Sequence, residues 1–252
     1  QTSADVQPMQ THYAFTCGGV DLKVTFTAPL FMEDLKLLSR PVNYLTYSVA
    51  ARDGREHEVE VYFEASPRWA LDQPYQQSAS KGYEADGLLY LKSGSKEQNI
   101  LAKQGDDLRI DWGYFYMVAG KENTAYSVGN STELRKNFVN GTLNSASLEG
   151  EDSNGNMALV RSHGKVKNVT DKIMLGYDDI YSIQYFGTNL RPYWNSKGDR
   201  TIEAEMLAAY NEYDKLLARC YAFDKKLMED ASAAGGKEYA ELCALAYRQS
   251  IA

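Results

Sequence analysis

The stretch "VNYLTYSVAARDGREHEVEVYFEAS", Val42–Ser66, decides the fold because apolar and polar residues alternate on both sides of a turn signal. Successive side chains of a β-strand point to opposite faces, so the alternation predicts strands with one apolar face. The residues that share this face on the first strand are Leu45, Tyr47 and Val49. Asp53 and Gly54 both tolerate positive φ and predict a hairpin turn. We therefore expect two antiparallel strands joined at this turn.

The second half of the stretch predicts a return strand with an acidic outer face. The residues that alternate on its inner face are His57, Val59, Val61 and Phe63. Glu56, Glu58 and Glu60 point the other way, into solvent, so they cannot serve His57 as catalytic partners. We expect a packing or surface role for His57.

Two further stretches extend the β prediction. "GVDLKVTFTAPL", residues 19–30, alternates with Leu22, Val24 and Phe26 on one face. "DDLRIDWGYFYMVAG", residues 106–120, is a nearly continuous apolar and aromatic run, which predicts a strand covered on both faces. Short strands punctuated by turn residues are typical of an antiparallel β-sandwich.

Near Thr201 the spacing changes to the three- and four-residue steps of an amphipathic helix. The apolar positions of this helix are Ile202, Met206, Ala209, Tyr213, Leu216, Cys220, Leu227 and Met228. Gly235-Gly236 breaks it, and a second helix begins near Lys237, so we expect a helical hairpin. Strands followed by helices predict two domains, a β-sandwich over residues 1–195 and the hairpin over residues 196–252.

The hairpin geometry predicts how far apart Cys220 and Cys243 lie. If the helices fold back at Gly235, Cys243 lies level with Lys226, and Cys220 is about 9 Å away along the axis. A disulfide requires a Cα separation below about 7 Å. We therefore expect Cys220 and Cys243 to be free thiols in the core.

Composition excludes several functional classes. The chain has 252 residues, is 44% hydrophobic and carries a net charge of -7 without a basic block, so we expect no nucleic-acid partner. Its apolar runs are shorter than the ~20 residues of a membrane span. The polar start "QTSADVQPMQ" has neither the basic nor the apolar part of a signal peptide.

Metal and cofactor signals are weak. The three histidines and three cysteines lie far apart, without zinc-ligand spacing. "EDSNGN", Glu151–Asn156, resembles the start of a calcium loop, but Met157 and His163 stand where that loop needs glycine and glutamate. We expect a surface hairpin loop here, and neither a metal nor a cofactor in the chain.

The densest candidate for chemistry is "GYDDIYSIQYFGTNLRPYWN", residues 176–195, where Asp178 and Asp179 stand among aromatic residues. Two acids flanked by aromatics can act as general acid and base, or bind a sugar or an amide. Adjacent residues of an extended strand face opposite sides, however. The favoured alternative is that one acid caps a backbone group or pairs with an arginine, while the aromatics form a domain interface.

A second candidate is the end of the last helix, where Tyr247, Arg248 and Gln249 lie beside its apolar stripe. Buried polar groups need hydrogen-bond partners. These side chains could bind a carboxylate or amide substrate, or they could bond to helices that the chain does not contain.

Five motifs resemble the glutaminase A family in their order along the chain. They are "GGVDLKVTFTAPL", "LLSRPVNYLTYSV", "IDWGYFY", "YDDIYSIQYFGTNLRPYW" and "GGKEYAELCALAYRQSIA". The resemblance implies an N-terminal β-sandwich joined to a larger α/α toroid, an extracellular or periplasmic location, and hydrolysis of the side-chain amide of glutamine. Family members continue beyond this point, so the chain is expected to be a fragment that holds the sandwich and the first helical pair of the toroid.

The resemblance assigns no catalytic residue to this segment. It implies that the missing toroid supplies the active site, that the fragment alone is inactive, and that its partners are the remainder of the toroid and a small amide substrate. A carbohydrate-binding or glycoside-hydrolase-associated module is the alternative, suggested by 19 tyrosines and 3 tryptophans. A purely structural domain is a third possibility, and the exposed helical hairpin could also pair two copies of the chain.

Overall fold

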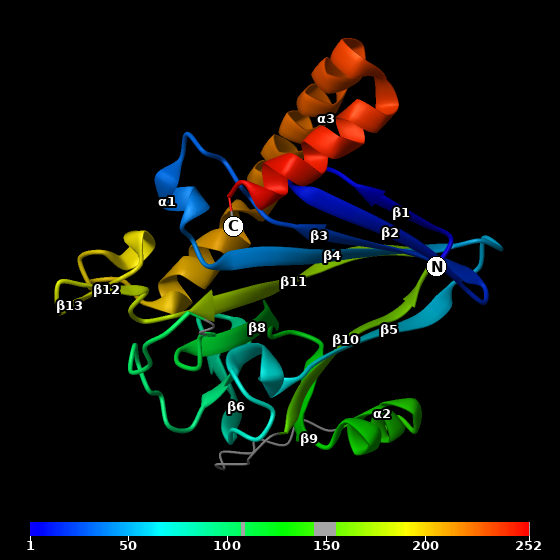
Figure 1. Ribbon diagram of the computed structural model, residues 1–252. Coiled ribbons are helices and arrows are strands. Elements are labelled where there is room, and N and C mark those ends of the chain that lie inside the picture. The colour runs from blue at the N-terminus through cyan, green and yellow to red at the C-terminus, as the bar shows by residue number, and fades with distance from the viewer. Residues whose placement is uncertain (107–108, 144–154, 252) are drawn as a thin grey trace. The chain divides into compact units, whose positions relative to one another are not determined.

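The computed structural model describes residues 1–106, 109–143 and 155–251 (Figure 1). It is mainly antiparallel β-structure followed by a helical C-terminal part, which confirms the predicted fold class. The backbone divides into two compact units. One holds residues 1–57, 165–174 and 206–252, and the other holds residues 58–164 and 175–205. The expected domain boundary at residues 195 and 196 stays a prediction, because these units follow another division.

The first unit contains a sheet with the strand order β1-β2-β3-β4-β11. Its first four strands pair antiparallel with their neighbours. A short helix, α1 (Leu35–Leu38), lies between β3 and β4, and its N-terminus is capped by Asp34. The strands are β1 (Ser3–Val6), β2 (Gln10–Cys17), β3 (Val20–Thr27), β4 (Val42–Ala51) and the first residues of β11 (Asn168–Asp178).

The helix α3 (Ile202–Gln249) docks on this sheet through tyrosines that are buried but hydrogen-bonded. The Tyr44 hydroxyl donates to the carbonyl of Ala209 at 3.0 Å, and Thr46 and Tyr213 share a hydroxyl–hydroxyl bond of 2.7 Å. Met206 and Ala209 are fully buried. The part of the predicted apolar stripe from Met206 to Tyr213 is therefore covered by the chain's own sheet, whereas Leu227 and Met228 are half-buried.

The face of β3 under this helix is not the one that its apolar residues suggest. Thr25 lies directly opposite His12 on one side and Thr46 on the other, so all three share the helix-covered face. Leu22, Val24 and Phe26 share the other face, as predicted, and Phe26 is 40% exposed there. Hydroxyl groups suit the covered face because each finds a partner, such as the bond between His12 Nδ1 and Thr25 Oγ1.

The prediction of a hairpin across Asp53 and Gly54 is wrong in its pairing. The turn forms, with Gly54 at φ +73° and the Asp53 carboxylate bound to both Arg55 N and His57 Nε2. However, β4 pairs with β3 and β11, whereas β5 (His57–Ala65) pairs with β10. One edge of β4 is taken by the preceding strand β3 and the other by β11, which is distant in sequence, and a local turn signal cannot report this.

The second unit contains two sheets. One has the order β11-β8-β7-β6 and uses the last residues of β11, and the other has the order β5-β10-β9. The sheets pack face to face where Gly82 of β6 leaves space for the ring of Tyr126 of β9, because a Cβ at Gly82 would lie 2.2 Å from that ring. The strands are β6 (Ser78–Ala85), β7 (Leu88–Ser95), β8 (Tyr114–Gly120), β9 (Thr124–Gly129) and β10 (Asn156–Val166).

The strand predicted within residues 106–120 is confirmed over β8, whose five central residues are buried on both faces, whereas residues 109–113 are not part of a strand. The same unit holds the helix α2 (Ser131–Val139), whose N-terminus is capped by the Asn130 side chain. It also holds the 3-10 turns η1 (Pro67–Ala70) and η2 (Tyr193–Asn195) and the small hairpin of β12 (Ile183–Tyr185) and β13 (Thr188–Leu190).

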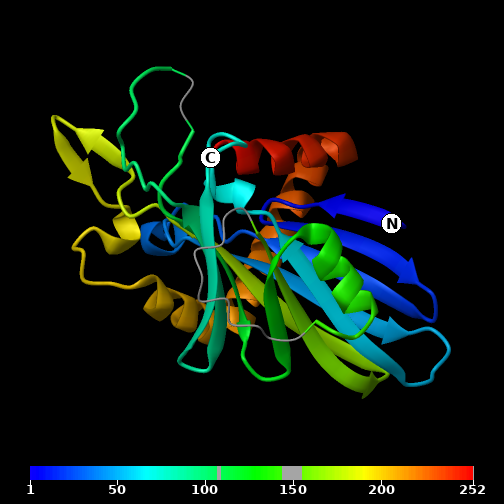
Figure 2. The same ribbon diagram turned by 90° about the horizontal axis from the view of Figure 1, so that it is seen from below.

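The helical hairpin is confirmed by a break inside α3, where Gly236 has φ +84° and ψ -174°. The arms of this hairpin are visible in orange and red in Figures 1 and 2. All three cysteines are free, as predicted for Cys220 and Cys243, but Cys243 is half-buried and not in the core. Cys220 is fully buried, and burial raises the pKa of its thiol to about 12. Within the described ranges, the helices are too short or too polar to cross a bilayer.

The backbone at Gly236 generates a prediction about the hairpin. Its φ and ψ lie in a region that is essentially open only to glycine, so Gly236→Ala should lower the free energy of unfolding by about 1–3 kcal/mol. Urea denaturation measures the loss. The matched control is Ser232→Ala on the exposed surface of the first arm, which should change stability by less than about 0.5 kcal/mol. Equal effects of the two substitutions would contradict the role of the break.

A buried acid links α3 to β2 in the first unit. Asp224 is 3% exposed, and its Oδ1 accepts a hydrogen bond of 2.7 Å from the backbone N–H of Met9. Burial raises the pKa of this carboxyl to about 6, although the nearby Arg248 opposes the shift. An unfolded aspartate has a pKa of about 3.9, so the folded chain holds this proton more tightly.

This raised pKa sets the sign of a pH effect. The contribution of Asp224 to stability is fully present below about pH 4 and is lost as the pH rises through about 6. Asp224→Asn keeps an acceptor for Met9 and removes the charge. Relative to this variant, the free energy of unfolding of the wild type should fall by on the order of 2–3 kcal/mol between pH 4 and pH 7.5. Urea denaturation at each pH isolates this difference from other carboxylates, and a constant difference would refute the assignment.

Candidate functional site

The backbone of the predicted acidic site turns sharply where β11 ends. Asp178 closes the strand, and Ile180 has φ +60°. The N–H of Tyr181 donates to the carbonyl of Asp179, which closes a γ-turn around Ile180. Positive φ is rare for a β-branched residue because its Cβ crowds the backbone. Such strain is held only where the surroundings impose it.

Each of the two acids at this turn binds a group of the turn itself. Asp178 Oδ1 accepts from the N–H of Ile180 at 3.0 Å, and Asp179 Oδ2 accepts from the Ser182 hydroxyl at 2.6 Å. Burial raises the pKa of Asp178, and the charge of Asp179 adds to this shift. The arrangement therefore resembles the capping alternative considered from the sequence more than a pair of catalytic acids.

A tryptophan and a glycine impose the turn. The indole N–H of Trp112 donates to two carbonyls, of Asp179 at 2.8 Å and of Tyr181 at 2.9 Å. Gly113, at φ +79°, lies so close that a Cβ on it would be 2.3 Å from the carbonyl oxygen of Asp178. The Tyr177 hydroxyl donates in return to the carbonyl of Trp112. Two segments far apart in sequence are thus locked together.

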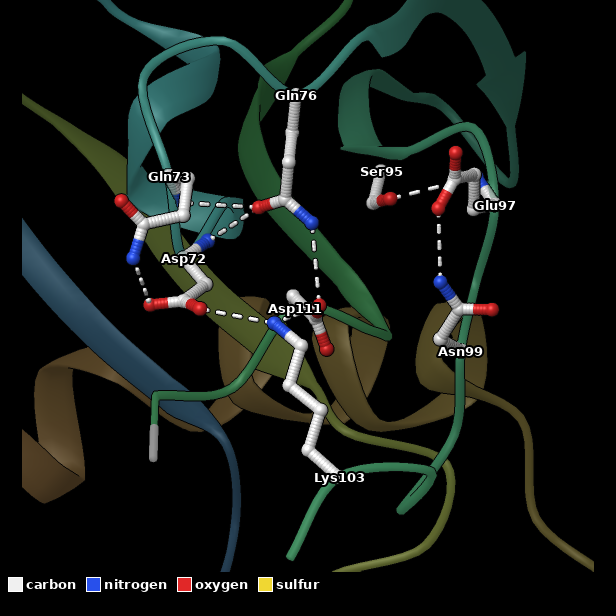
Figure 3. Close-up of polar contacts among 8 residues, drawn as sticks. All are labelled: Asp72, Gln73, Gln76, Ser95, Glu97, Asn99, Lys103 and Asp111. Atoms are coloured by element: carbon white, nitrogen blue, oxygen red, sulfur yellow. Dashed lines mark hydrogen bonds and ion pairs between the residues drawn. The ribbon is translucent and has the colours of Figure 1, made fainter. Parts of the chain in front are cut away.

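An ion-pair cluster fixes the residue that directly precedes Trp112 in the chain. Figure 3 shows Lys103 between two carboxylates, at 2.8 Å from Asp72 Oδ2 and 2.7 Å from Asp111 Oδ2. Gln76 donates to the same oxygen of Asp111 at 3.1 Å and accepts from the N–H groups of Asp72 and Gln73. Asp111 is 1% exposed and directly precedes Trp112, so the cluster fixes the position of the indole.

The adjacent face of the β6-β7-β8 sheet carries a lysine among tyrosines that sequence reasoning missed. Lys92 Nζ lies 3.5 Å from the ring centroid of Tyr114, and Lys81 stands directly opposite Lys92 on β6. The Tyr83 hydroxyl donates to Glu203 at 2.6 Å. Burial lowers the pKa of Lys92, with the charge of Lys81 adding to the effect. The half-buried ammonium over aromatic rings is a cation–π site.

The second candidate group lies in the first unit and contacts the chain's own backbone. Arg248 Nε donates to the carbonyls of Gln7 at 2.8 Å and Pro8 at 3.2 Å. The Tyr247 hydroxyl donates to the carbonyl of Leu30. Gln249 is exposed. The structure therefore gives Tyr247 and Arg248 partners within the chain and leaves the amide of Gln249 in solvent.

No metal-binding group is found where the structure describes the chain: no three histidine, cysteine, aspartate or glutamate side chains come together there. Glu151–Asn154, the first part of the calcium-like sequence, lies outside the described residues.

Three comparisons with known proteins each match most or all of the chain. The protein-family model described as "Domain of unknown function (DUF5127)" matches residues 9–230. Glutaminase A of Aspergillus oryzae is 26% identical over 270 residues, which cover 100% of this chain and 38% of that protein. A solved structure of a putative kojibiose phosphorylase from the human microbiome superposes with a TM-score of 0.46 and 8% identity, over 95% of this chain and 26% of that one.

The indole contacts generate a prediction. Trp112→Phe keeps the aromatic packing and removes the N–H that binds two carbonyls, so it should cost about 1–2 kcal/mol of stability. Chemical denaturation measures this loss. Trp69→Phe is the control because Trp69 is 61% exposed, and its effect should stay within about 0.5 kcal/mol. A loss no larger than that of the control would show that the indole N–H does not hold the turn.

Proposed function

Because the chain belongs to the family described as "Domain of unknown function (DUF5127)", we propose that it is the accessory β-rich part of a glutaminase-like amidohydrolase. The reaction would convert the side-chain amide of glutamine into glutamate and ammonia. The observation that carries this proposal is the match to Glutaminase A over the full length of the chain. The chain spans 38% of that relative, so the catalytic groups are proposed to lie in the rest of the polypeptide.

The contacts at the candidate sites support an accessory role. Asp178 and Asp179 bind groups of their own turn, and Arg248 binds the backbone of Gln7 and Pro8. These polar groups hold the fold in place, and a substrate amide would have to displace internal partners to reach them. An extracellular or periplasmic location is part of the same proposal and rests on the family resemblance.

The second arm of α3 supports the idea that the helical hairpin begins an α/α toroid. Leu242 is 62% exposed and Leu245 46% exposed on this arm. The groove between the arms is lined mostly by small or apolar side chains such as Phe223 and Ala231, together with Lys226 and Asp230. Exposed apolar surface of this kind is typical of a face that other helices cover. A second copy of the chain could cover the same face.

Glycan binding is the second candidate, and an exposed tryptophan favours it. Trp69 sits on η1, is 61% exposed and is held by a ring contact with Phe115 at 5.2 Å. A fixed, exposed ring of this kind can stack on a sugar. Tyr75, which is 81% exposed, lies six residues further along the chain.

One assay separates the two candidates. Ammonia release from glutamine is measured for the complete gene product and for residues 1–252 alone. We expect release by the complete gene product and none above background by residues 1–252. Activity of residues 1–252 would overturn the accessory role. No release by either, together with quenching of tryptophan fluorescence by oligosaccharides that Trp69→Ala abolishes, would establish the glycan alternative.

A further inference from the structure

The hairpin of β12 and β13 presents an apolar face that the second unit leaves bare. Ile183 lies directly opposite Leu190, and Tyr185 lies opposite Thr188, so these four side chains share one face. All six strand residues are exposed, and the hairpin is drawn in yellow in Figures 1 and 2. A two-stranded hairpin is marginal in water unless another surface packs against it.

The tip of this hairpin is the least covered aromatic site in the described residues. Phe186 is 90% exposed, and its ring meets Tyr185 edge-on at 4.5 Å. Phe186 and Gly187 have φ of +44° and +78°, the conformation of a type I′ turn that favours asparagine and glycine. A phenylalanine in the first position of this turn is strained, and its ring is almost entirely exposed to solvent.

Side-chain contacts hold the base of the hairpin on both sides. Trp112 binds the carbonyls of Asp179 and Tyr181 on either side of the γ-turn. The Arg191 guanidinium lies 4.8 Å from the ring centroid of Tyr181, on the other side of the base. A bare tip on a fixed base is preorganised for binding, since little conformational freedom is lost when a partner covers it.

The charge of the hairpin limits the kind of partner. Residues 180–190 contain no Asp, Glu, Lys or Arg. An uncharged tip lacks the cations that attract nucleic acid or an anionic membrane. Tyrosine and phenylalanine next to amide side chains are instead typical of the buried centre of protein interfaces.

We propose that Tyr185 and Phe186 insert into an uncharged apolar recess on the remainder of the same polypeptide. That remainder is the part corresponding to the length of Glutaminase A that this chain does not match. The inference rests on the proposed function, because only a longer polypeptide supplies this partner. The γ-turn at Ile180 sets the direction of the hairpin, and the hydrogen bonds of Trp112 stabilise this strained turn.

Hydrogen–deuterium exchange tests the contact. The amides of residues 183–190 should exchange at least about tenfold more slowly in the complete gene product than in residues 1–252 alone. In the complete gene product, Phe186→Ser should remove most of this protection. The matched control is Tyr75→Ser, at an exposed tyrosine outside the hairpin, which should leave the protection intact. An unchanged unfolding midpoint in residues 1–252 shows that each variant folds.

Two outcomes would overturn the contact. Equal exchange in the complete gene product and in residues 1–252 would mean that nothing in the polypeptide covers the tip. Protection that appears in residues 1–252 as their concentration rises would assign the tip to a second copy. Exchange does not depend on turnover, so protection of the hairpin in a protein that fails to hydrolyse glutamine would reject the proposed activity and leave the contact standing.

Discussion

The indole N–H of Trp112 is the interaction on which the second unit's unusual geometry depends. One donor binds two carbonyls that flank a β-branched residue at positive φ, and it thereby fixes the direction in which the chain leaves β11. The neighbouring Gly113 is required because a side chain there would collide with the carbonyl of Asp178. Behind the indole, the buried carboxylate of Asp111 is neutralised by Lys103. The strained turn, the close packing at Gly113 and the Asp111–Lys103 ion pair are therefore all linked through Trp112 and its neighbours.

The sequence allowed the strands and the helical hairpin to be predicted because their signals are local. The unbroken apolar run of β8 indicated a strand buried on both faces, and Gly236 marked the break in α3. The pairing of β4 with β11 and of β5 with β10 could not be predicted, since it depends on which distant strand fills the free edge. Similarly, alternation separated the two faces of β3, but it did not show that the face of Thr25, and not the face of Leu22, Val24 and Phe26, lies under α3.

The candidate site could be found in the sequence only as a region. The acids and aromatics of residues 176–195 stood out, whereas the roles of Asp178 and Asp179 depend on a γ-turn that isoleucine gives no reason to expect. Lys92 was missed because a lysine at an alternating strand position ordinarily lies in solvent. Its burial follows from two tyrosines of the neighbouring strand β8, which only the fold brings beside it.

The different surroundings of the three cysteines give the chain a natural attachment point. The thiolate is the reactive form of cysteine, and a thiol with a pKa of about 12, such as that of Cys220, is almost entirely protonated at neutral pH. Cys243 is partly covered between the helical arms, whereas Cys17 is exposed at the end of β2. A thiol-directed dye or resin should therefore react first at the β2–β3 turn. The unmodified sequence can in this way be immobilised or tracked optically, with the helices and the aromatic hairpin left free.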